Sequence, residues 1–198
     1  MRRISIMFVL LAFFVYTAAA VSDTKVVTTW KATDVGTVNF NKIVVAFLNQ
    51  DTDLRHRVED GLARRIRRSV AAHTFVPDSE LRDVEAVKAR LSSNQVDGAI
   101  VVRLAEVAKD VTISPGGVTY TPYPMFWDMW GTGWGVVSTP TLAFEEKVVT
   151  AEIIVYSVAT AKPIWAGRLK ATNPKSLRVL LDDLVKSGSA ELRKQKLI

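Results

Sequence analysis

The side chains that enzymes use as nucleophiles, bases or metal ligands are scarce in this chain. It has no cysteine, so it can form neither a disulfide nor a thiolate metal site, and its only histidines are His56 and His73. His56 lies three residues before Glu59 on an expected helix, so both could face one metal ion, but the sequence offers no third ligand. Arginines flank His56 on both sides. We therefore interpret this segment as a solvated helix face and expect no metal site.

The serine, acidic and glycine-rich segments carry no catalytic signature. A Ser-His-Asp hydrolase would need a Gly-x-Ser-x-Gly elbow, which the sequence lacks. The acid pairs at 145–146 and 182–183 are neighbours in sequence and point in different directions, unlike the facing carboxylates of a glycosidase. The glycine-rich run 131–135 lacks the Lys-Ser/Thr of a phosphate loop. We expect a protein that is not an enzyme and has no cofactor, with an enzyme of unrecognised type as the alternative.

The segment 111–144 differs in composition from the rest of the chain. It holds a single charged residue, Asp128, with seven aromatic residues, five of the ten glycines and four of the seven prolines. Rings on such a loop suit a membrane interface, stacking on sugars or docking to a protein. The candidate contact residues are Tyr120, Tyr123, Phe126, Trp127, Trp130 and Trp134. The alternative is that these rings fold back over the domain's own sheet, because indole and phenol rings seek any apolar cover.

The elements that would position these residues follow from the hydrophobic pattern. The continuous apolar run 43–48 predicts a strand that is covered on both faces and lies in or near the centre of its sheet. Leucines, valines and isoleucines four residues apart predict a helix from 52 to about 70, capped by Asp51 or Thr52. The other expected elements are strands at 25–31, 74–76 and 99–107, a helix carrying 81–91, a hairpin of 148–158 and 163–171, and a helix from 175 to about 186.

Length and element order together predict the fold class. The chain has 198 residues, of which 48% are hydrophobic and 23% charged, as expected for one globular domain. The order βαβαβ, then a hairpin and a helix, predicts a single α/β domain with a mixed β-sheet and helices packed on it in two or three layers. We expect this domain at 21–198, with the aromatic Gly/Pro-rich loop inserted at 111–144 and the hairpin plus helix at its C-terminal end.

The first twenty residues have the pattern of a secretory signal peptide. Two arginines precede an apolar run at 6–16, and Ala18 and Ala20 are the small residues that signal peptidase recognises. We expect cleavage between Ala20 and Val21, a periplasmic or secreted protein and no transmembrane span after signal removal. The run has 11 residues, short of the roughly 20 needed to span a bilayer, and an uncleaved membrane anchor is the alternative.

The charge balance of the mature chain is modest. Removing the two arginines of the signal leaves 24 basic residues against 20 acidic ones, which changes the net charge from +6 to +4. A secreted protein rarely meets nucleic acid, so we expect no nucleic-acid partner. The remaining charge favours solubility and attraction to anionic envelope surfaces.

Six short segments carry a family resemblance through their order and spacing. They are 25–30 (KVVTTW), 42–47 (KIVVAF), 58–63 (VEDGLA), 96–101 (VDGAIV), 153–156 (IIVY) and 163–167 (PIWAG). Together they resemble bacterial envelope lipoproteins that carry a domain of unknown function, a family similar in architecture to curli-assembly and penicillin-binding-protein-activator lipoproteins. The resemblance implies an α/β fold, a place at the cell envelope and no assigned catalytic residues. Such proteins usually have a cysteine after the signal peptide, whereas this chain has Val21 there, so a lipid anchor is excluded.

Two functions are compatible with these observations. The first is a non-enzymatic periplasmic envelope protein that binds a protein partner or an envelope surface through the aromatic loop, with the α/β body as scaffold. The second is a glycan or small-ligand binding module of the periplasm. Trp127, Trp130 and Trp134 suit either function, because a sugar face and a hydrophobic groove are both recognised by such rings.

Overall fold

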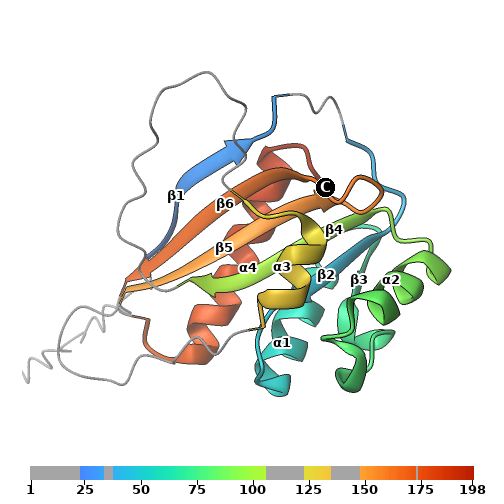
Figure 1. Ribbon diagram of the computed structural model, residues 1–198. Helices are drawn as coiled ribbons and strands as arrows, with labels where there is room; N and C mark the ends of the chain where they lie inside the picture. The colour runs from blue at the N-terminus through green and yellow to red at the C-terminus, as the bar shows by residue number, and fades with distance from the viewer. Residues whose placement is uncertain (1–22, 34–37, 106–122, 135–147, 173) are drawn as a thin grey trace, which may run out of the picture.

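The computed structural model describes residues 23–33, 38–105, 123–134, 148–172 and 174–198. The elements are β1 (Asp23–Lys31), β2 (Ile43–Phe47), α1 (Thr52–Ala63), β3 (Ser69–Ala71), the 3-10 turns η1 (Ala72–Thr74) and η2 (Asp78–Glu80), α2 (Val84–Ser93), β4 (Gly98–Ala105), α3 (Phe126–Thr132), β5 (Val148–Ser157), β6 (Pro163–Thr172) and α4 (Leu177–Lys194). The strands form one six-stranded sheet in the order β1-β6-β5-β4-β2-β3 (Figure 1). The sequence-based prediction of an α/β fold with a mixed sheet is confirmed.

Strand β2 lies inside the sheet, as its apolar run predicts. It pairs in parallel with β3 on one side and with β4 on the other, and Val44 stands beside Val70 and Ala99. All five of its residues are buried. The rest of the sheet is antiparallel, with β4 next to β5, β5 next to β6 in the expected hairpin, and β6 next to β1.

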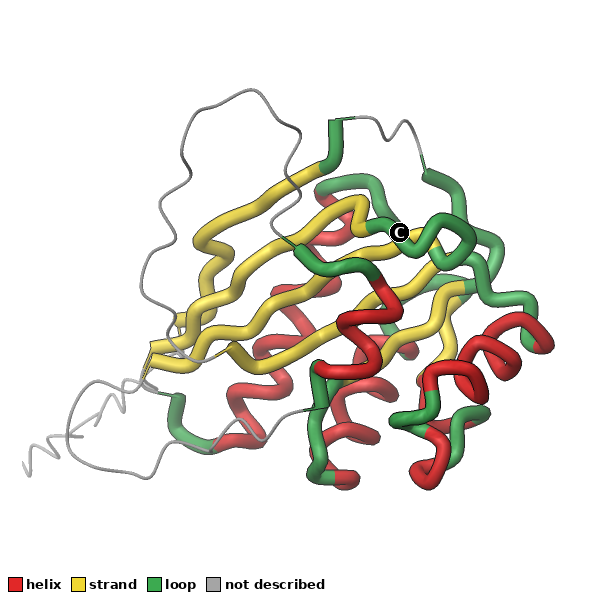
Figure 2. Tube along the Cα trace, in the orientation of Figure 1, coloured by secondary structure: helices red, strands yellow, loops and turns green. Residues whose placement is uncertain are grey.

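The sheet separates two apolar cores, because successive residues of a strand point to opposite faces. On one face, Val45 packs with α1 and α4 in a cluster that includes Leu62 and Leu184. On the other face, Val44 packs in a cluster that includes Leu91 of α2 and Trp130 of α3. Figure 2 shows α2 and α3 in front of the sheet and α4 behind it. The domain therefore has three layers.

Several predicted element boundaries are wrong, for local reasons. Helix α1 ends at Ala63 instead of about 70, because the chain then turns so that Ser69–Ala71 can pair with β2 as β3. The hydroxyl of Ser69 donates to the carbonyls of Ala63, the last residue of the helix, and of Ile66, which follows it. The prediction of a strand at 74–76 is wrong, because Thr74 ends η1 and the strand of this region is β3 at 69–71. Helix α2 begins at Val84, where the Asp83 side chain caps it.

Helix α4 continues through Gly188 to Lys194, whereas the sequence suggested an end near 186. A Cβ atom at Gly188 would lie 2.4 Å from Ile153 Cδ1, so the glycine allows the helix to approach the sheet closely. Helix α3 also differs from the prediction, because it lies inside the segment 111–144, which was expected to be a loop. The expected signal peptide and its cleavage site lie outside the described residues. Within the described ranges, no helix is long and apolar enough to cross a membrane.

Candidate functional site

The aromatic residues of α3 and its C-terminal flank are largely part of the core. Phe126 and Trp130 are fully buried, and Trp134 is 5% exposed. The Trp130 indole donates to the carbonyl oxygen of Leu81 at 2.8 Å, and its ring meets that of Trp134 edge-on at 5.6 Å. The expectation of outward-facing rings is wrong for these three residues, because each ring buries a large apolar surface against the sheet and α2. They do not form an open contact surface.

Two of the predicted contact residues keep partial exposure. Tyr123 lies 5.7 Å from the Trp30 ring, and Trp127 lies beneath the ammonium of Lys88, which is 5.3 Å from its ring centre. Tyr120 lies outside the described residues. Whether any of these residues contacts a partner or ligand stays a prediction.

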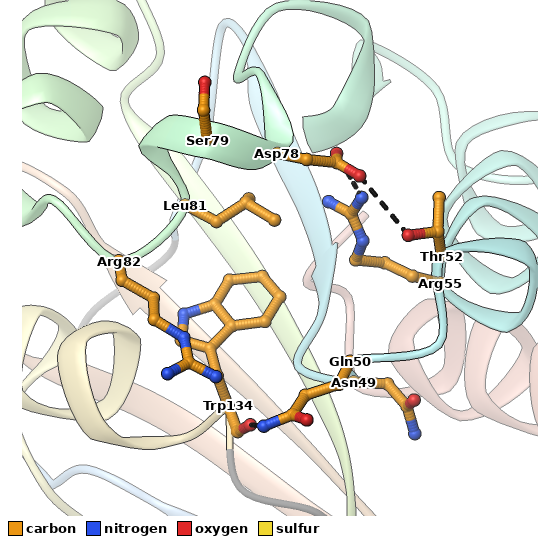
Figure 3. Close-up of a pocket in the computed structure, with 9 residues that line it drawn as sticks. All are labelled: Asn49, Gln50, Thr52, Arg55, Asp78, Ser79, Leu81, Arg82 and Trp134. Atoms are coloured by element: carbon orange, nitrogen blue, oxygen red, sulfur yellow. Dashed lines mark hydrogen bonds and ion pairs between the residues drawn. The ribbon is translucent and has the colours of Figure 1, made fainter.

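A pocket of about 280 Å³ lies beyond the carboxyl end of β2 (Figure 3). Its walls come from the loop between β2 and α1, from the first turn of α1, from the segment around η2 and from the residue two positions after α3. The lining residues are Asn49, Gln50, Thr52, Arg55, Asp78, Ser79, Leu81, Arg82 and Trp134. Among the singled-out aromatic residues that the structure describes, Trp134 is the one that lines this pocket.

The topology explains why a pocket forms at this place. From β2 the chain leads to α1 on one face of the sheet, whereas from β3 it leads to α2 on the other face. Connections that leave neighbouring parallel strands toward opposite faces open a crevice at the carboxyl ends of those strands, where open α/β sheets bind their ligands. The Gln50 amide closes one side of the crevice by donating to the carbonyl oxygen of Trp134 at 2.9 Å.

Arg55 is the buried cation of the pocket. Its side chain is 1% exposed, and its Nη2 lies 2.5 Å from Asp78 Oδ1. Thr52 donates its hydroxyl to the other oxygen of this carboxylate at 3.3 Å. The hydrogen bond from Arg55 is the main cause that lowers the pKa of Asp78. The second guanidinium nitrogen, Nη1, is buried and has no hydrogen-bond partner among the described residues.

A second buried polar group, Glu59, lies one helical turn after Arg55. Its carboxylate accepts from the backbone N–H of Phe47 at 3.1 Å and from that of His73 at 2.9 Å. The Nδ1 atom of His73 also lies 2.9 Å from it, and the His73 ring stacks on His56 at 4.0 Å. Burial raises the pKa of Glu59 and outweighs these hydrogen bonds, which lower it.

This arrangement is structural, because the carboxylate joins β2 to η1. The suggested pair of His56 and Glu59 does not share a site, since Glu59 faces Phe47 and His73 instead. In the described part of the chain, no three His, Cys, Asp or Glu side chains are placed to hold a metal ion.

The sequence did not single out the pocket residues Arg55, Asp78 and Arg82. Arg55 was taken as a solvated neighbour of His56. Its spacing nevertheless indicated burial, because it precedes Val58 by three residues and Leu62 by seven, on the apolar side of the helix. Asp78 begins the short turn η2 and Arg82 follows it, in a region where hydrophobic periodicity gives no information.

Comparisons with known proteins add little to this geometry. No protein-family model matches the chain, and neither does any curated protein. Among solved structures, the chain is similar to the PelC dodecamer from Paraburkholderia phytofirmans, with a TM-score of 0.45 and 13% identity over 84% of this chain and 96% of that one. It is also similar to lipoprotein GNA1162 from Neisseria meningitidis, with a TM-score of 0.39 and 12% identity over 77% of this chain and 98% of that one. These similarities are too distant to bear on function.

Proposed function

We propose that the protein is a non-enzymatic binding protein whose α/β body holds a small polar ligand in the pocket at the carboxyl end of β2. The observation that carries this proposal is the pocket itself, which combines an indole wall with buried and exposed arginines. Its volume of about 280 Å³ is near the lower end of ligand pockets, which span roughly 300 to 1,000 Å³. The ligand is therefore a small molecule rather than a polymer segment.

The pocket chemistry favours binding over catalysis. The acidic group among the lining residues is Asp78, and its lowered pKa makes it a weak base. The hydroxyl of Thr52 donates to that carboxylate, which is held by Arg55 and is poorly suited to activating a nucleophile. The lining residues can orient and neutralise a ligand, which is the task of a binding module.

The segment from Tyr123 to Trp127 supports a second candidate function. Met125 stands out as an exposed large apolar side chain beside the half-buried Tyr123 and Trp127. Such a surface fits the binding of a protein partner or an envelope surface. The signal-like pattern of residues 1–20 supports a periplasmic location for either function. A mature protein that begins at Val21, measured by intact mass in the periplasmic fraction, would agree with that location.

The pocket proposal is tested by obstructing the pocket. Gln50 is an exposed lining residue, so the Gln50→Trp variant should fold and occupy the pocket with its indole. Gln195→Trp, at the end of α4, introduces the same side chain away from the pocket. We expect ligand-observed NMR with a set of anionic, neutral and cationic small molecules to find binders of the wild type and of Gln195→Trp that Gln50→Trp does not bind. A set without binders, or binders that all three proteins bind equally, would contradict the proposal.

A further inference from the structure

We infer that the ligand of this pocket presents an anionic oxygen group, a carboxylate or a phosphate, to Arg55, Arg82 and the indole N–H of Trp134. The inference rests on the proposed function, because it assigns the chemical class of the ligand that the pocket would bind. Figure 3 shows Arg55 and Asp78 near each other, with Arg82 and Trp134 together farther along the pocket.

Two buried donors in the pocket wall are unsatisfied. Nη1 of Arg55 and Nε1 of Trp134 are both buried and have no hydrogen-bond partner within the described ranges. Both atoms can only donate, since neither a guanidinium nor an indole nitrogen accepts a hydrogen bond. Burying a donor without a partner is unfavourable, because the donor has lost its hydrogen bonds to water. A ligand that supplies an acceptor to both atoms would recover part of this cost, and a neutral donor would not.

The two side chains that carry these donors line the same pocket. The guanidinium carbon of Arg55 lies 6.0 Å from the centre of the Trp134 ring. An anionic group has two or three oxygens and accepts hydrogen bonds from several directions, so it suits a pocket whose donors lie on different walls. The bound group would thus be held between a cation and an indole donor.

The charges of the lining residues also favour an anion. Arg55 and Arg82 contribute two positive charges and Asp78 contributes one negative charge, which leaves the pocket with one net positive charge. Asp78 faces Nη2 of Arg55 and leaves Nη1 unpaired, so it orients the guanidinium without saturating it. A monoanionic group would complete the neutralisation.

The amino-terminal end of α1 does not carry this inference. Asp51 caps the helix by accepting from the Leu54 N–H, and Asp53 lies in the first turn, so two carboxylates already neutralise the positive end of the helix dipole. The anion site depends instead on the buried Arg55.

The other buried charges of the fold differ from this site. Glu152, on β5, is buried between Arg103 and Arg168, and its two oxygens face one arginine each at 2.5 and 2.8 Å. That carboxylate belongs to the chain itself and already fills the space between the two cations. In the pocket, Nη1 of Arg55 has no such carboxylate among the described residues.

The experiment follows the indole N–H signal of Trp134 by NMR, assigned by its loss in Trp134→Phe. The probes are acetate, inorganic phosphate, acetamide as the neutral analogue of acetate, and sodium chloride at equal ionic strength. We expect acetate or phosphate, or both, to shift this signal in a saturable way and acetamide and chloride to leave it unchanged. The response to acetate or to phosphate distinguishes the two kinds of anionic group.

The matched variants are Arg82→Gln in the pocket and Arg178→Gln on α4, both at exposed arginines, so that both proteins fold. We expect Arg82→Gln to weaken anion binding about tenfold, which corresponds to about 1.4 kcal/mol, and Arg178→Gln to bind like the wild type. Equal responses to acetate and acetamide, or equal affinities in the two variants, would overturn the inference. If neutral compounds bind to the wild type but not to Gln50→Trp, the proposed function stands and only the assignment of an anionic ligand fails.

Discussion

At the scale of single residues, the most informative group is the buried carboxylate of Glu59. The N–H of Phe47 cannot pair with β3, because the register of β3 against β2 ends at Val45. Glu59 accepts from this N–H and from the backbone N–H of His73, and so completes the hydrogen bonding at the end of β2. The carboxylate therefore holds the β2 end that forms one wall of the pocket.

Replacing Glu59 with glutamine should destabilise the protein by about 1 to 3 kcal/mol, because the new amide N–H₂ faces donors where the carboxylate had an acceptor. The measurement is the free energy of unfolding from urea denaturation. Glu85→Gln is the matched control, since Glu85 is exposed on α2 and should change the stability by less than about 0.5 kcal/mol. Equal stabilities for the two variants would show that Glu59 does not hold the end of β2.

The same variant should change the pH dependence of stability in a defined direction. Burial raises the pKa of Glu59 above its ordinary value of 4.5, so the folded protein binds this proton more tightly than the unfolded chain does. The contribution of Glu59 to stability is therefore full below 4.5 and falls as the pH rises through the raised pKa. The stability difference between the wild type and Glu59→Gln should be largest near pH 4 and shrink as the pH rises through the raised pKa. A difference that grows with pH would contradict the pKa direction.

Single residues also show why the site was difficult to predict from the sequence. Arg55 and Glu59 follow the apolar stripe of α1, but charged residues are rarely buried, and sequence alone favours placing them in solvent. Their partners Asp78 and His73 are 23 and 14 positions away, so the pairing depends on how β3 and η2 return to α1. Trp134 was singled out as an aromatic residue, but its place beside Arg55 depended on the fold.

At the scale of elements, helix α3 contains a matched pair of tryptophans with different burial. Trp130→Ala should cost about 3 to 5 kcal/mol, because the ring is fully buried and its N–H is bonded to Leu81. Trp127→Ala should cost about 1 kcal/mol, since that ring is partly solvated. Thermal melts of the two variants measure the difference. Similar losses would mean that α3 is not packed as described.

Helix α4 provides a second test at this scale. Gly188→Ala raises helix propensity but directs a methyl group at Ile153, so we expect a net loss of about 1 to 3 kcal/mol from overpacking. Ile153→Val removes the Cδ1 atom that would clash. The double variant should therefore be more stable than the sum of the two single changes indicates, in a double-mutant cycle of unfolding free energies. Strict additivity would show that the two residues do not touch.

The elements that sequence patterns predicted well are those with strong periodicity. Strand β2 and the β5–β6 hairpin were predicted because apolar runs and alternation leave few alternatives. The end of α1 was missed because Ile66 and Val70 continue the helical stripe, although Val70 belongs to β3. Helix α3 was missed because it is short, because the surrounding segment 111–144 is rich in glycine and proline, and because its helical form depends on tertiary packing rather than on propensity.

At the scale of the whole molecule, stability depends on the sheet that separates the two cores. Val45→Asp would bury an unpaired charge in the core between the sheet and helices α1 and α4, at a cost of several kcal/mol against a total stability of about 5 to 15 kcal/mol. We expect this variant not to fold. Val27→Asp is the matched control, because Val27 is 52% exposed at an irregularity of β1 and should retain the wild-type melting temperature. Circular dichroism melts compare the two, and similar melting temperatures would refute the central place of β2.

The two edge strands of the sheet discourage the addition of further strands. In the described part of the chain, β3 is one edge strand. It is only three residues long, so it provides few backbone groups for an incoming strand. The other edge strand, β1, has nine residues, but its pairing with β6 is interrupted by a register shift between Val26 and Thr28. Short edge strands and β-bulges discourage aggregation through edge-to-edge pairing. Repairing the bulge by deleting Val27 would therefore remove one of these two barriers to self-association.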